Sequence, residues 1–469
     1  MLCQQSVTQS HGSTFTELLA HIESNSEYWR QHTTVAERKR MGQQFTPPGM
    51  AAQLSLMAPA TDESDIRIAD LGAGTGILST SLAHQVTAAR DNSAVFFHGF
   101  ETDKRLHADL TQAWSYFAEQ GNRNVRFSLD DDFTQEAKAL LETGNLPGRE
   151  RPQYITSNPP FNKLPRHSEL ATMMRDFGVP VSNLYAAFTV LAIAFLRPGG
   201  HLLKILPRSF CSGAYFGPFR RFFMENMSVE HITLYKSRSC FKNVLQENLL
   251  IYASKKPQAS RIRITVANDP NSVPEYDLVL PSDVILSPGF WALPRSISDL
   301  EGFIANRSQP NTLSSLGLSL STGKTELHRL AGGQVTPVIY AADFDRSGQW
   351  VWQESRKPRQ VPTEQKRQLS LPPAGGFVVL KRISSNDGDE PQRLMPAWLS
   401  RQTVGHDTVT LDNHVQYIHR DHQPLTDSEG RALVDFLRSD EAQAVMRTIN
   451  GTTQINRNDM GYLRLPNIG

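Results

Sequence analysis

The stretch Ile66-Arg-Ile-Ala-Asp-Leu-Gly-Ala-Gly-Thr-Gly76 predicts the fold class of this chain. Residues 66–70 have the pattern of a short strand, and glycines follow at every second position from Gly72. Glycine lets a chain turn sharply and lets its backbone approach a ligand, because it has no Cβ. Residues 77–88 then have the pattern of a helix. The stretch is therefore typical of a strand, a tight turn and a helix, with room for a ligand at the turn.

Further strand and helix patterns alternate after this unit. The strand patterns cover residues 94–100, 125–129, 153–157, 201–206, 231–235 and 248–254, and helix patterns at 106–120 and 184–196 lie between them. Strands that alternate with helices form parallel sheets that helices cover on both faces. The sequence therefore predicts an α/β fold with a mainly parallel sheet.

The pattern changes at about residue 257. Prolines become frequent, and short strand patterns follow at 261–266, 336–340, 376–380 and 415–419, with one amphipathic helix at 426–450. Residues 1–40 are polar and helical in pattern. We therefore predict a helical lead-in over 1–40, a first domain over 41–257 and a β-rich α+β domain over 258–469.

The composition is that of an ordinary globular protein: 469 residues, 39% hydrophobic and 20% charged, with 48 basic and 47 acidic side chains. No apolar run approaches the ~18 residues that a membrane span needs, and the first thirty residues lack the order of a secretory signal. The three cysteines are widely spaced, and the fourteen histidines show no metal-binding pair. We therefore expect a cytoplasmic protein with no membrane partner and no metal.

Acidic residues stand at the ends of the first three predicted strands. Asp70 ends the first, Glu101 ends the second, and Asp132 with Phe133 follows the third. The carboxyl ends of parallel strands meet at one edge of a sheet, so these side chains suit an amino group, a ribose and an adenine. S-adenosylmethionine contains all three groups. The spacing G-x-G-x-G also differs from the G-x-G-x-x-G of dinucleotide sites, which argues against a nicotinamide cofactor.

The segment Ser157-Asn158-Pro159-Pro160-Phe161 follows the fourth predicted strand. An exocyclic amine on a base is a weak nucleophile, because its lone pair is delocalised into the ring. The side-chain oxygen of Asn158 and the carbonyl oxygen of Pro159 would accept its hydrogens and turn the lone pair towards a methyl donor. Proline suits this role because its fixed φ holds the carbonyl in one direction. Phe161 would stack on a base drawn out of the double helix.

Asn158-Pro159-Pro160-Phe161, together with Gly42-Gln-Gln-Phe-Thr-Pro47, resembles the gamma-class amino-group DNA methyltransferases typified by the TaqI modification enzyme. The resemblance implies a Rossmann-like, S-adenosylmethionine-dependent methyltransferase sheet, with these four residues as the catalytic motif and a C-terminal target-recognition domain. It implies that the cofactor is bound by Thr46, Asp70, Gly72, Gly74, Glu101, Asp132 and Phe133. It also implies that Phe241 is a second aromatic contact of the flipped adenine.

A basic run lies in the predicted second domain. Residues 356–382 hold seven basic side chains against Glu364 alone: Arg356, Lys357, Arg359, Lys366, Arg367, Lys381 and Arg382. Polyanion binding depends on the local field more than on the net charge of the chain. The back half also resembles, loosely, the recognition domains of modification enzymes. We therefore expect these seven residues to contact double-stranded DNA.

Together, the residues and the resemblance predict a site-specific, adenine-specific DNA methyltransferase. It would move the methyl group of S-adenosylmethionine to the N6 amine of a flipped adenine, as the modification enzyme of a restriction–modification system. Any cognate endonuclease would be a separate protein, because no residues remain for a nuclease domain. Alternatives are an rRNA base amino-methyltransferase, a protein glutamine methyltransferase and a DNA-binding specificity protein without catalysis. N4 of cytosine stays open as a target, although Asn158 favours adenine.

Overall fold

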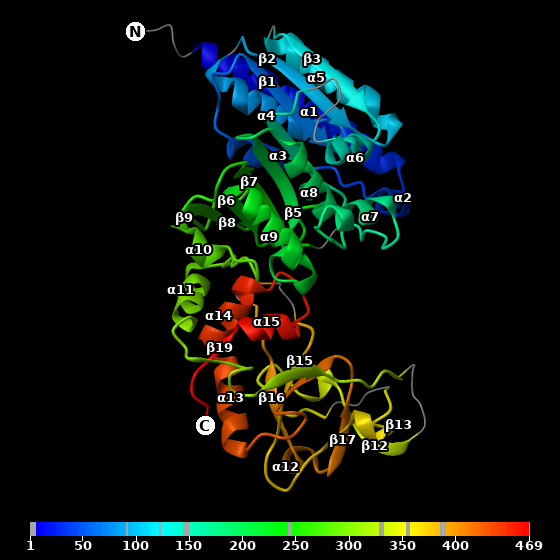
Figure 1. Cartoon of the computed structure of the whole chain (residues 1–469), viewed down its shortest axis with the longest axis vertical. Coiled ribbons are helices and arrows are strands. Elements are labelled where there is room, and N and C mark those ends of the chain that lie inside the picture. Colours follow the sequence, from blue (N-terminus) through cyan, green and yellow to red (C-terminus); the bar gives the residue numbers. More distant parts are fainter. Residues whose placement is uncertain are drawn as a thin grey trace. The chain divides into compact units, whose positions relative to one another are not determined.

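The computed structural model describes residues 6–468 except 91, 122, 144–149, 243–245, 328–332, 353–356, 385–387 and 389–390, and it leaves out the side chains of 6–14. The chain forms two compact units, which we describe separately (Figure 1). The first unit comprises Met1–Phe210 and Tyr215–Trp291, and the second comprises Cys211–Ala214 and Ala292–Gly469. Among the described residues, no helix combines the length and the apolar character that crossing a membrane requires.

The first unit is built on a nine-stranded sheet in the order β3-β2-β1-β4-β5-β7-β6-β8-β9. Its strands are β1 (Asp65–Leu71), β2 (Ala94–Phe100), β3 (Val125–Asp130), β4 (Tyr154–Ser157), β5 (His201–Pro207), β6 (Ser228–Tyr235), β7 (Asn248–Ser254), β8 (Arg261–Ala267) and β9 (Tyr276–Pro281). Strands β1 to β5 are all parallel, whereas β7 is antiparallel to both of its neighbours. The predicted α/β fold with a mainly parallel sheet is confirmed.

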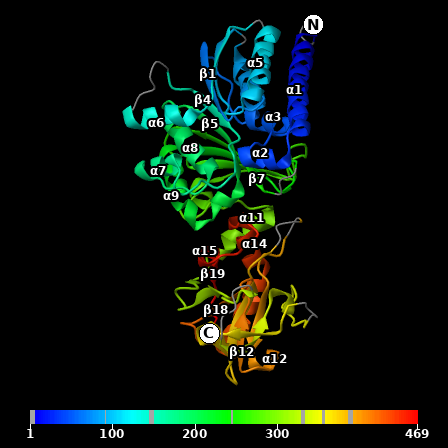
Figure 2. The ribbon, with the colours of Figure 1, turned by 90° about the vertical axis from the view of Figure 1, so that its right-hand side faces the viewer.

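Helices cover both faces of this sheet. They are α1 (Ser6–His32), α2 (Val35–Met41), α3 (Pro48–Leu56), α4 (Ile77–Val86), α5 (His107–Gly121), α6 (Phe133–Thr143), α7 (Glu169–Asp176), α8 (Leu184–Phe195), α9 (Gly217–Asn226) and α10 (Ser282–Ile285). Figure 2 shows α1, α3 and α5 on one side of the sheet and α6, α8 and α9 on the other. Because apolar side chains leave water on both faces, the inner strands β4, β5, β6 and β7 are buried along most of their length, whereas the edge strands β3 and β9 are mostly half-buried or exposed.

The strand order places a crevice beside β1. The chain runs from β1 outwards to β2 and β3, and then returns to β4 on the other side of β1. Connections that leave in opposite directions open a crevice at the carboxyl ends of such strands, which is where open α/β sheets bind ligands. The glycine-rich turn after β1 and the Asn-Pro-Pro-Phe segment after β4 both lie at this edge.

The N-terminal helix belongs to the first unit instead of preceding it. Leu18 and Ile22 of α1 are buried in the same core cluster as Leu82 of α4 and Trp114 of α5. The indole of Trp29 also donates a hydrogen bond of 2.6 Å to Asp109 on α5. The polar pattern of residues 1–40 concealed this packing, because only one narrow face of α1 is apolar.

The first unit also extends beyond the predicted boundary. Strands β8 and β9 add to its sheet through parallel pairing of β8 with β6, so the unit ends at Trp291 instead of residue 257. Short strand patterns do not reveal which sheet they join, because pairing partners are distant in sequence. The functional division at residue 257 stays a prediction.

The second unit contains two four-stranded sheets and several helices. One sheet has the order β11 (Ser319–Thr322), β18 (Val415–His419), β15 (Gly376–Lys381) and β16 (Pro396–Ser400). The other has the order β13 (Gln360–Thr363), β12 (Gln334–Ile339), β17 (Thr408–Leu411) and β14 (Gln368–Ser370). A two-stranded sheet also joins β10 (Asn311–Thr312) to β19 (Arg464–Leu465). The α-helices among the described residues are α11 (Ile297–Asn306), α12 (Arg401–Val404), α13 (Asp427–Arg438), α14 (Asp440–Ile449) and α15 (Arg457–Tyr462). The predicted β-rich α+β character is confirmed.

The single helix predicted over 426–450 is two helices. Ser439 has an extended backbone, with φ −62° and ψ 151°, and its hydroxyl accepts a hydrogen bond from the Ala442 main-chain N–H. Ser439 ends α13 and caps the start of α14. This cap divides the continuous amphipathic pattern into two helices.

Candidate active site

A pocket opens at the carboxyl ends of β1, β2 and β4. It has a volume of about 840 Å³ including its open mouth. Its lining comes from residues 41–46, 72–75, 77–78, 100–102 and 131–133, with Asn158, Pro160 and Phe188. The structure therefore brings together most of the predicted cofactor and catalytic residues.

The glycine-rich turn forms the floor of this pocket. Gly72 and Gly74 have φ values of +82° and +57°, which side-chain-bearing residues adopt only with strain. A Cβ added to either glycine would meet no atom within 4 Å. The turn therefore leaves open space where a ligand approaches the backbone.

Glu101 fastens this turn to the end of β2. Its Oε2 accepts a hydrogen bond of 2.8 Å from the Gly74 N–H, and its Oε1 accepts one of 2.8 Å from the Asp103 N–H. The carboxyl is only 8% exposed, and this burial raises its pKa above the ordinary range. Each carboxylate oxygen accepts more than one hydrogen bond, so Glu101 keeps acceptor capacity for the hydroxyls of a ligand.

Asp132 and Phe133 form the third wall. Both oxygens of Asp132 accept hydrogen bonds from Thr134, one from its N–H at 2.8 Å and one from its hydroxyl at 2.7 Å. This contact caps the start of α6. Phe133 is buried and meets Phe188 of α8 edge to face, with ring centroids 4.7 Å apart. Phe188 was missed from the sequence because it stands in an apolar helix, where any aromatic has the signature of a core residue.

Asp70 differs from its predicted position. Of the predicted acids, Glu101 and Asp132 line the pocket, whereas the Asp70 side chain is buried beneath the turn. Its Oδ2 accepts a hydrogen bond of 3.2 Å from Ser79 N–H in the first turn of α4, and burial raises its pKa to about 7. A carboxylate at the end of a strand can cap the next helix as readily as it binds a ligand, and here it caps α4.

A buried amine, Lys204 of β5, lies near Asp70. The Lys204 side chain is 0% exposed, and its Nζ has no hydrogen-bond partner among the described residues. Burial lowers its pKa to about 7, and the charge of Asp70 opposes that shift. The two groups are too far apart to form an ion pair in this structure. The sheet therefore buries an amine whose positive charge is only weakly compensated by Asp70.

Asn158 is held by its amide nitrogen. Nδ2 donates one hydrogen bond of 3.0 Å to the Gln44 main-chain oxygen and another of 3.0 Å to the Thr46 hydroxyl. A carbonyl oxygen only accepts, so the nitrogen of the amide must face Gln44. The opposite atom, Oδ1, is buried and has no hydrogen-bond partner within the described part of the chain. Asn158 therefore presents a free, fixed acceptor beside the pocket.

Residues 42–47 pack directly against this catalytic corner. A Cβ added to Gly42 would lie 2.3 Å from Cβ of Pro160, so only glycine fits. Thr46 lines the pocket and at the same time accepts the hydrogen bond from Asn158. The Gly-Gln-x-Phe-Thr-Pro segment therefore sets the direction of the Asn158 amide, a role that its sequence did not reveal.

Phe161 and Phe241 are neighbours, but their rings are not parallel. Their centroids are 6.4 Å apart and their planes make an angle of 82°. Phe241 is 1% exposed and belongs to the core cluster, whereas Phe161 lines a second pocket, which shares residues 42–45 with the first. In this structure the two rings are nearly perpendicular and do not form a parallel-sided slot.

The predicted DNA-contacting residues are divided between different surroundings. Lys366 and Arg367 line a pocket of the second unit together with Lys324. Arg359 instead makes an ion pair of 2.5 Å with Asp343, which is 1% exposed. Lys357 lies over the ring of Tyr340, and Lys381 lies over the ring of Phe344. Arg382 donates a hydrogen bond to the main-chain oxygen of Asn413. Arg356 lies outside the described residues. The described residues of the run therefore lie on segments that belong to both sheets of the unit.

Among the residues that the structure describes, one group of possible metal ligands comes together only in three dimensions. His98 of β2, Asp130 of β3 and Glu136 of α6 offer ligand atoms that all lie within 4.8 Å of one another. His98 Nε2 is 2.8 Å from Asp130 Oδ2. The sequence indicated no metal set because these residues stand on three separate elements.

Comparisons with known proteins agree with this arrangement. A family model described as N-6 DNA Methylase matches residues 23–277. The chain is 26% identical over 453 residues to the type II methyltransferase M.BsuBI of Bacillus subtilis and 29% identical over 456 residues to M.PstI of Providencia stuartii. Both alignments cover 92% of this chain, with 88% and 87% of the relatives. The fold also resembles that of the type IIL restriction-modification enzyme MmeI, solved in complex with DNA, with a TM-score of 0.50, 12% identity and coverage of 94% of this chain and 64% of that chain.

Proposed function

The chain belongs to the N-6 DNA methylase family and is a DNA methyltransferase with S-adenosylmethionine as its methyl donor, and we propose that the corner around Asn158 performs the transfer. The target is the N6 amine of one adenine within a short sequence of duplex DNA. The two type II relatives support a role as the modification enzyme of a restriction–modification system, with any endonuclease as a separate protein.

The observation that carries the catalytic proposal is the unpartnered Oδ1 of Asn158. A buried acceptor without a donor costs free energy, and because Asn158 lines the pocket, a donor that arrives with the substrate would satisfy this oxygen. The N6 amine is such a donor. With its hydrogens held by Asn158 Oδ1 and by the Pro159 carbonyl oxygen, its lone pair leaves conjugation with the ring and points towards the pocket. The rigid Pro159–Pro160 pair keeps that second acceptor in place.

The residues of the first pocket fit S-adenosylmethionine. When bound, this cofactor supplies a methyl group on a positively charged sulfur. The open space at Gly72 and Gly74 accommodates its approach to the backbone, and Glu101 keeps acceptor capacity for ribose hydroxyls. Asp132, Phe133 and Phe188 form the wall for the adenine, and Thr46 lies on the methionine side. Asp70 serves by positioning the turn and the start of α4.

Phe161 completes the site by stacking on the base that has left the double helix. Extrusion of the base costs a few kcal/mol of free energy. Stacking on an aromatic ring contributes ~1–3 kcal/mol and so offsets part of this cost. Phe241 supports Phe161 from the core by its edge-to-face contact. Direct contact of Phe241 with the base would require its ring to turn.

The test is to sequence modified bases in DNA from a methylation-deficient bacterial host that expresses this chain. We expect N6-methyladenine at one position of one short sequence, and none in cells that express Asn158→Ala. N4-methylcytosine would assign the same amine chemistry to the other base and contradict the adenine target. Unmodified DNA together with intact cofactor binding would contradict the proposed function.

A further inference from the structure

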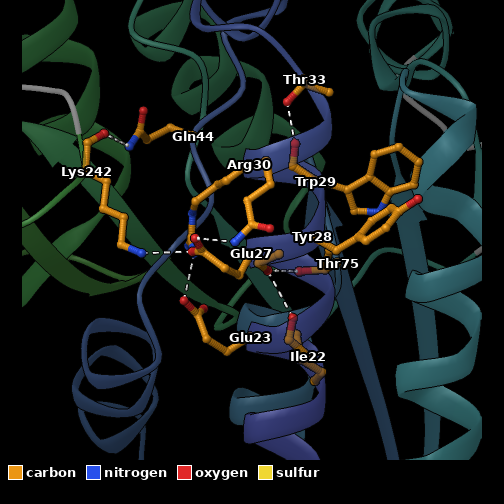
Figure 3. A network of polar contacts seen from close by, with 12 residues as sticks. Ile22, Glu23, Glu27, Tyr28, Trp29, Arg30, Thr33, Gln44, Thr75 and Lys242 are labelled. Atoms are coloured by element: carbon orange, nitrogen blue, oxygen red, sulfur yellow. Dashed lines mark hydrogen bonds and ion pairs between the residues drawn. The ribbon is translucent and has the colours of Figure 1, made fainter.

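One carboxylate oxygen near the catalytic corner lies between two cations. Oε2 of Glu27 is 2.8 Å from the Arg30 guanidinium and 2.8 Å from Nζ of Lys242 (Figure 3). Arg30 also contacts Glu23 at 2.8 Å, and its side chain is only 12% exposed. Glu27 and Arg30 lie on α1, whereas Lys242 directly follows Phe241. The contact therefore joins the N-terminal helix to the segment that supports the target base.

These residues line the second pocket, the one that Phe161 and Asn162 also line. Of its described lining residues, four are cationic and one is anionic: Arg30, Arg38, Lys39 and Lys242 against Glu27. Residues 42–45 line both this pocket and the cofactor pocket. A nucleotide that enters beside Phe161 therefore meets a predominantly positively charged surface.

A short series of hydrogen bonds links this surface to the catalytic amide. Gln44 Nε2 donates to the main-chain oxygen of Lys242 at 3.4 Å, and the main-chain oxygen of Gln44 accepts from Asn158 at 3.0 Å. Gln44 thus contacts both Lys242 and Asn158. Gln44 is therefore the single residue between a group bound at Lys242 and Asn158, whose Oδ1 would orient the amine.

We propose that Arg30 and Lys242 form the site for a backbone phosphate of the extruded nucleotide, and that Glu27 occupies this site in the DNA-free protein. The inference rests on the proposed function. A carboxylate oxygen and a phosphate oxygen present the same acceptor to an arginine and a lysine, but the phosphate belongs to a chain held by many other contacts. Glu27 is 38% exposed, and Gln31 Nε2 lies 3.4 Å from its other oxygen, so the side chain has a place to turn.

Replacement of the Glu27 carboxylate by a phosphate at Arg30 and Lys242 does not require protonation of Glu27. Hydrogen bonds from Lys242 and Arg30 lower the pKa of this carboxyl to about 2, so it is ionised at neutral pH. The other charged groups that face it are Glu23, which shares Arg30, and the cations of the pocket. The incoming phosphate must therefore displace a charged carboxylate.

The test compares Lys242→Met with Glu27→Gln in the full-length protein. The probe is a duplex that carries the methylation site found by sequencing, with S-adenosylhomocysteine present so that no transfer occurs. We expect Lys242→Met to weaken duplex binding several-fold and to reduce the slope of log affinity against log salt by about 0.9. We expect Glu27→Gln to tighten binding roughly two- to fivefold, because the site no longer holds its own anion.

The opposite signs separate a phosphate site from a structural ion pair. If the pair only held α1 in place, both substitutions would weaken binding together, and that result would overturn the inference. Unchanged affinity in both variants would also overturn it. The matched control is the exposed pair Lys138–Glu169, at 2.8 Å, for which Lys138→Met and Glu169→Gln should leave duplex affinity unchanged.

Failure of the phosphate site and failure of the proposed function give different results. A wild-type chain that methylates DNA, with variants that shift affinity in the same direction, contradicts only the phosphate site. A wild-type chain that binds and methylates no DNA contradicts both. Equilibrium binding of S-adenosylmethionine to each variant shows that the first unit has folded, because its pocket is built from six separate segments.

Discussion

Gly42 lies so close to Pro160 that a Cβ on residue 42 would be 2.3 Å from Cβ of Pro160. The two residues are far apart in the sequence, yet this contact holds the segment that orients Asn158 against the segment that contains it. Gly42 also has φ +67°, which favours glycine. The catalytic corner therefore depends on a close approach of two loops that neither loop would form alone.

Gly42→Ala should lower both stability and the rate of methyl transfer. The left-handed backbone costs about 1–2 kcal/mol for alanine, and the overlap with Pro160 adds about 1–3 kcal/mol. Gly199→Ala is the matched control, because Gly199 has φ +71° but a Cβ there meets no atom within 4 Å. Denaturant unfolding and single-turnover transfer measure the two effects. Equal behaviour of both variants would show that the contact with Pro160 does not matter.

Asn158→Ala should abolish most methyl transfer while cofactor binding stays intact. Loss of one fixed hydrogen-bonding group at a reacting atom typically costs ~10²–10³-fold in rate. Asn268→Ala is the control, because among the described residues this exposed side-chain amide donates a hydrogen bond only to the adjacent Asp269. Transfer of a labelled methyl group to duplex DNA, with S-adenosylmethionine binding measured separately, gives the result. Near-normal transfer by Asn158→Ala would refute its catalytic role.

Lys204→Met should stabilise the protein, most strongly at neutral pH and below. The pKa of Lys204 falls from 10.5 to about 7 on folding, so between these values the unfolded chain binds a proton that the folded chain releases. Stability of the wild type therefore rises with pH across this window, and the amine costs least near pH 10. We expect a gain of about 1–4 kcal/mol at pH 7 that shrinks towards pH 10.

Urea unfolding at several pH values measures this gain, with the exposed Lys138→Met as the control. A pH-independent effect, or a loss of stability, would mean that the buried amine has a favourable partner in the folded protein.

In the second unit, Lys366→Met with Arg367→Met should weaken DNA binding and flatten its salt dependence. Each lost phosphate contact reduces the slope of log affinity against log salt by about 0.9. Arg359→Met should act differently: it leaves the buried carboxyl of Asp343 without its ion pair, so it should cost about 1–3 kcal/mol of stability. An unchanged slope for the double variant would remove that pocket from the DNA interface.

The sequence was sufficient for features that local chemistry determines. A strand that ends in a glycine-rich turn, acids at the ends of the next strands and an Asn-Pro-Pro-Phe segment each carry their signal within a few adjacent residues. Their meeting at one edge follows from parallel pairing alone. This is why the α/β fold, the family and the pocket around Gly72, Glu101 and Asn158 could all be predicted.

Features that depend on contacts between distant segments needed the tertiary structure. Phe188 is indistinguishable from a core residue until α8 is placed beside Phe133, and Asp70 could bind a ligand or cap α4 until Ser79 is positioned. Only the folded chain joins α1 to Lys242 through Glu27 or turns the oxygen of Asn158 into a free acceptor. The sequence by itself determined which chemical groups stand at the strand ends, because those groups are local. The direction of each group, and what it touches, was decided by packing between segments that no local pattern records.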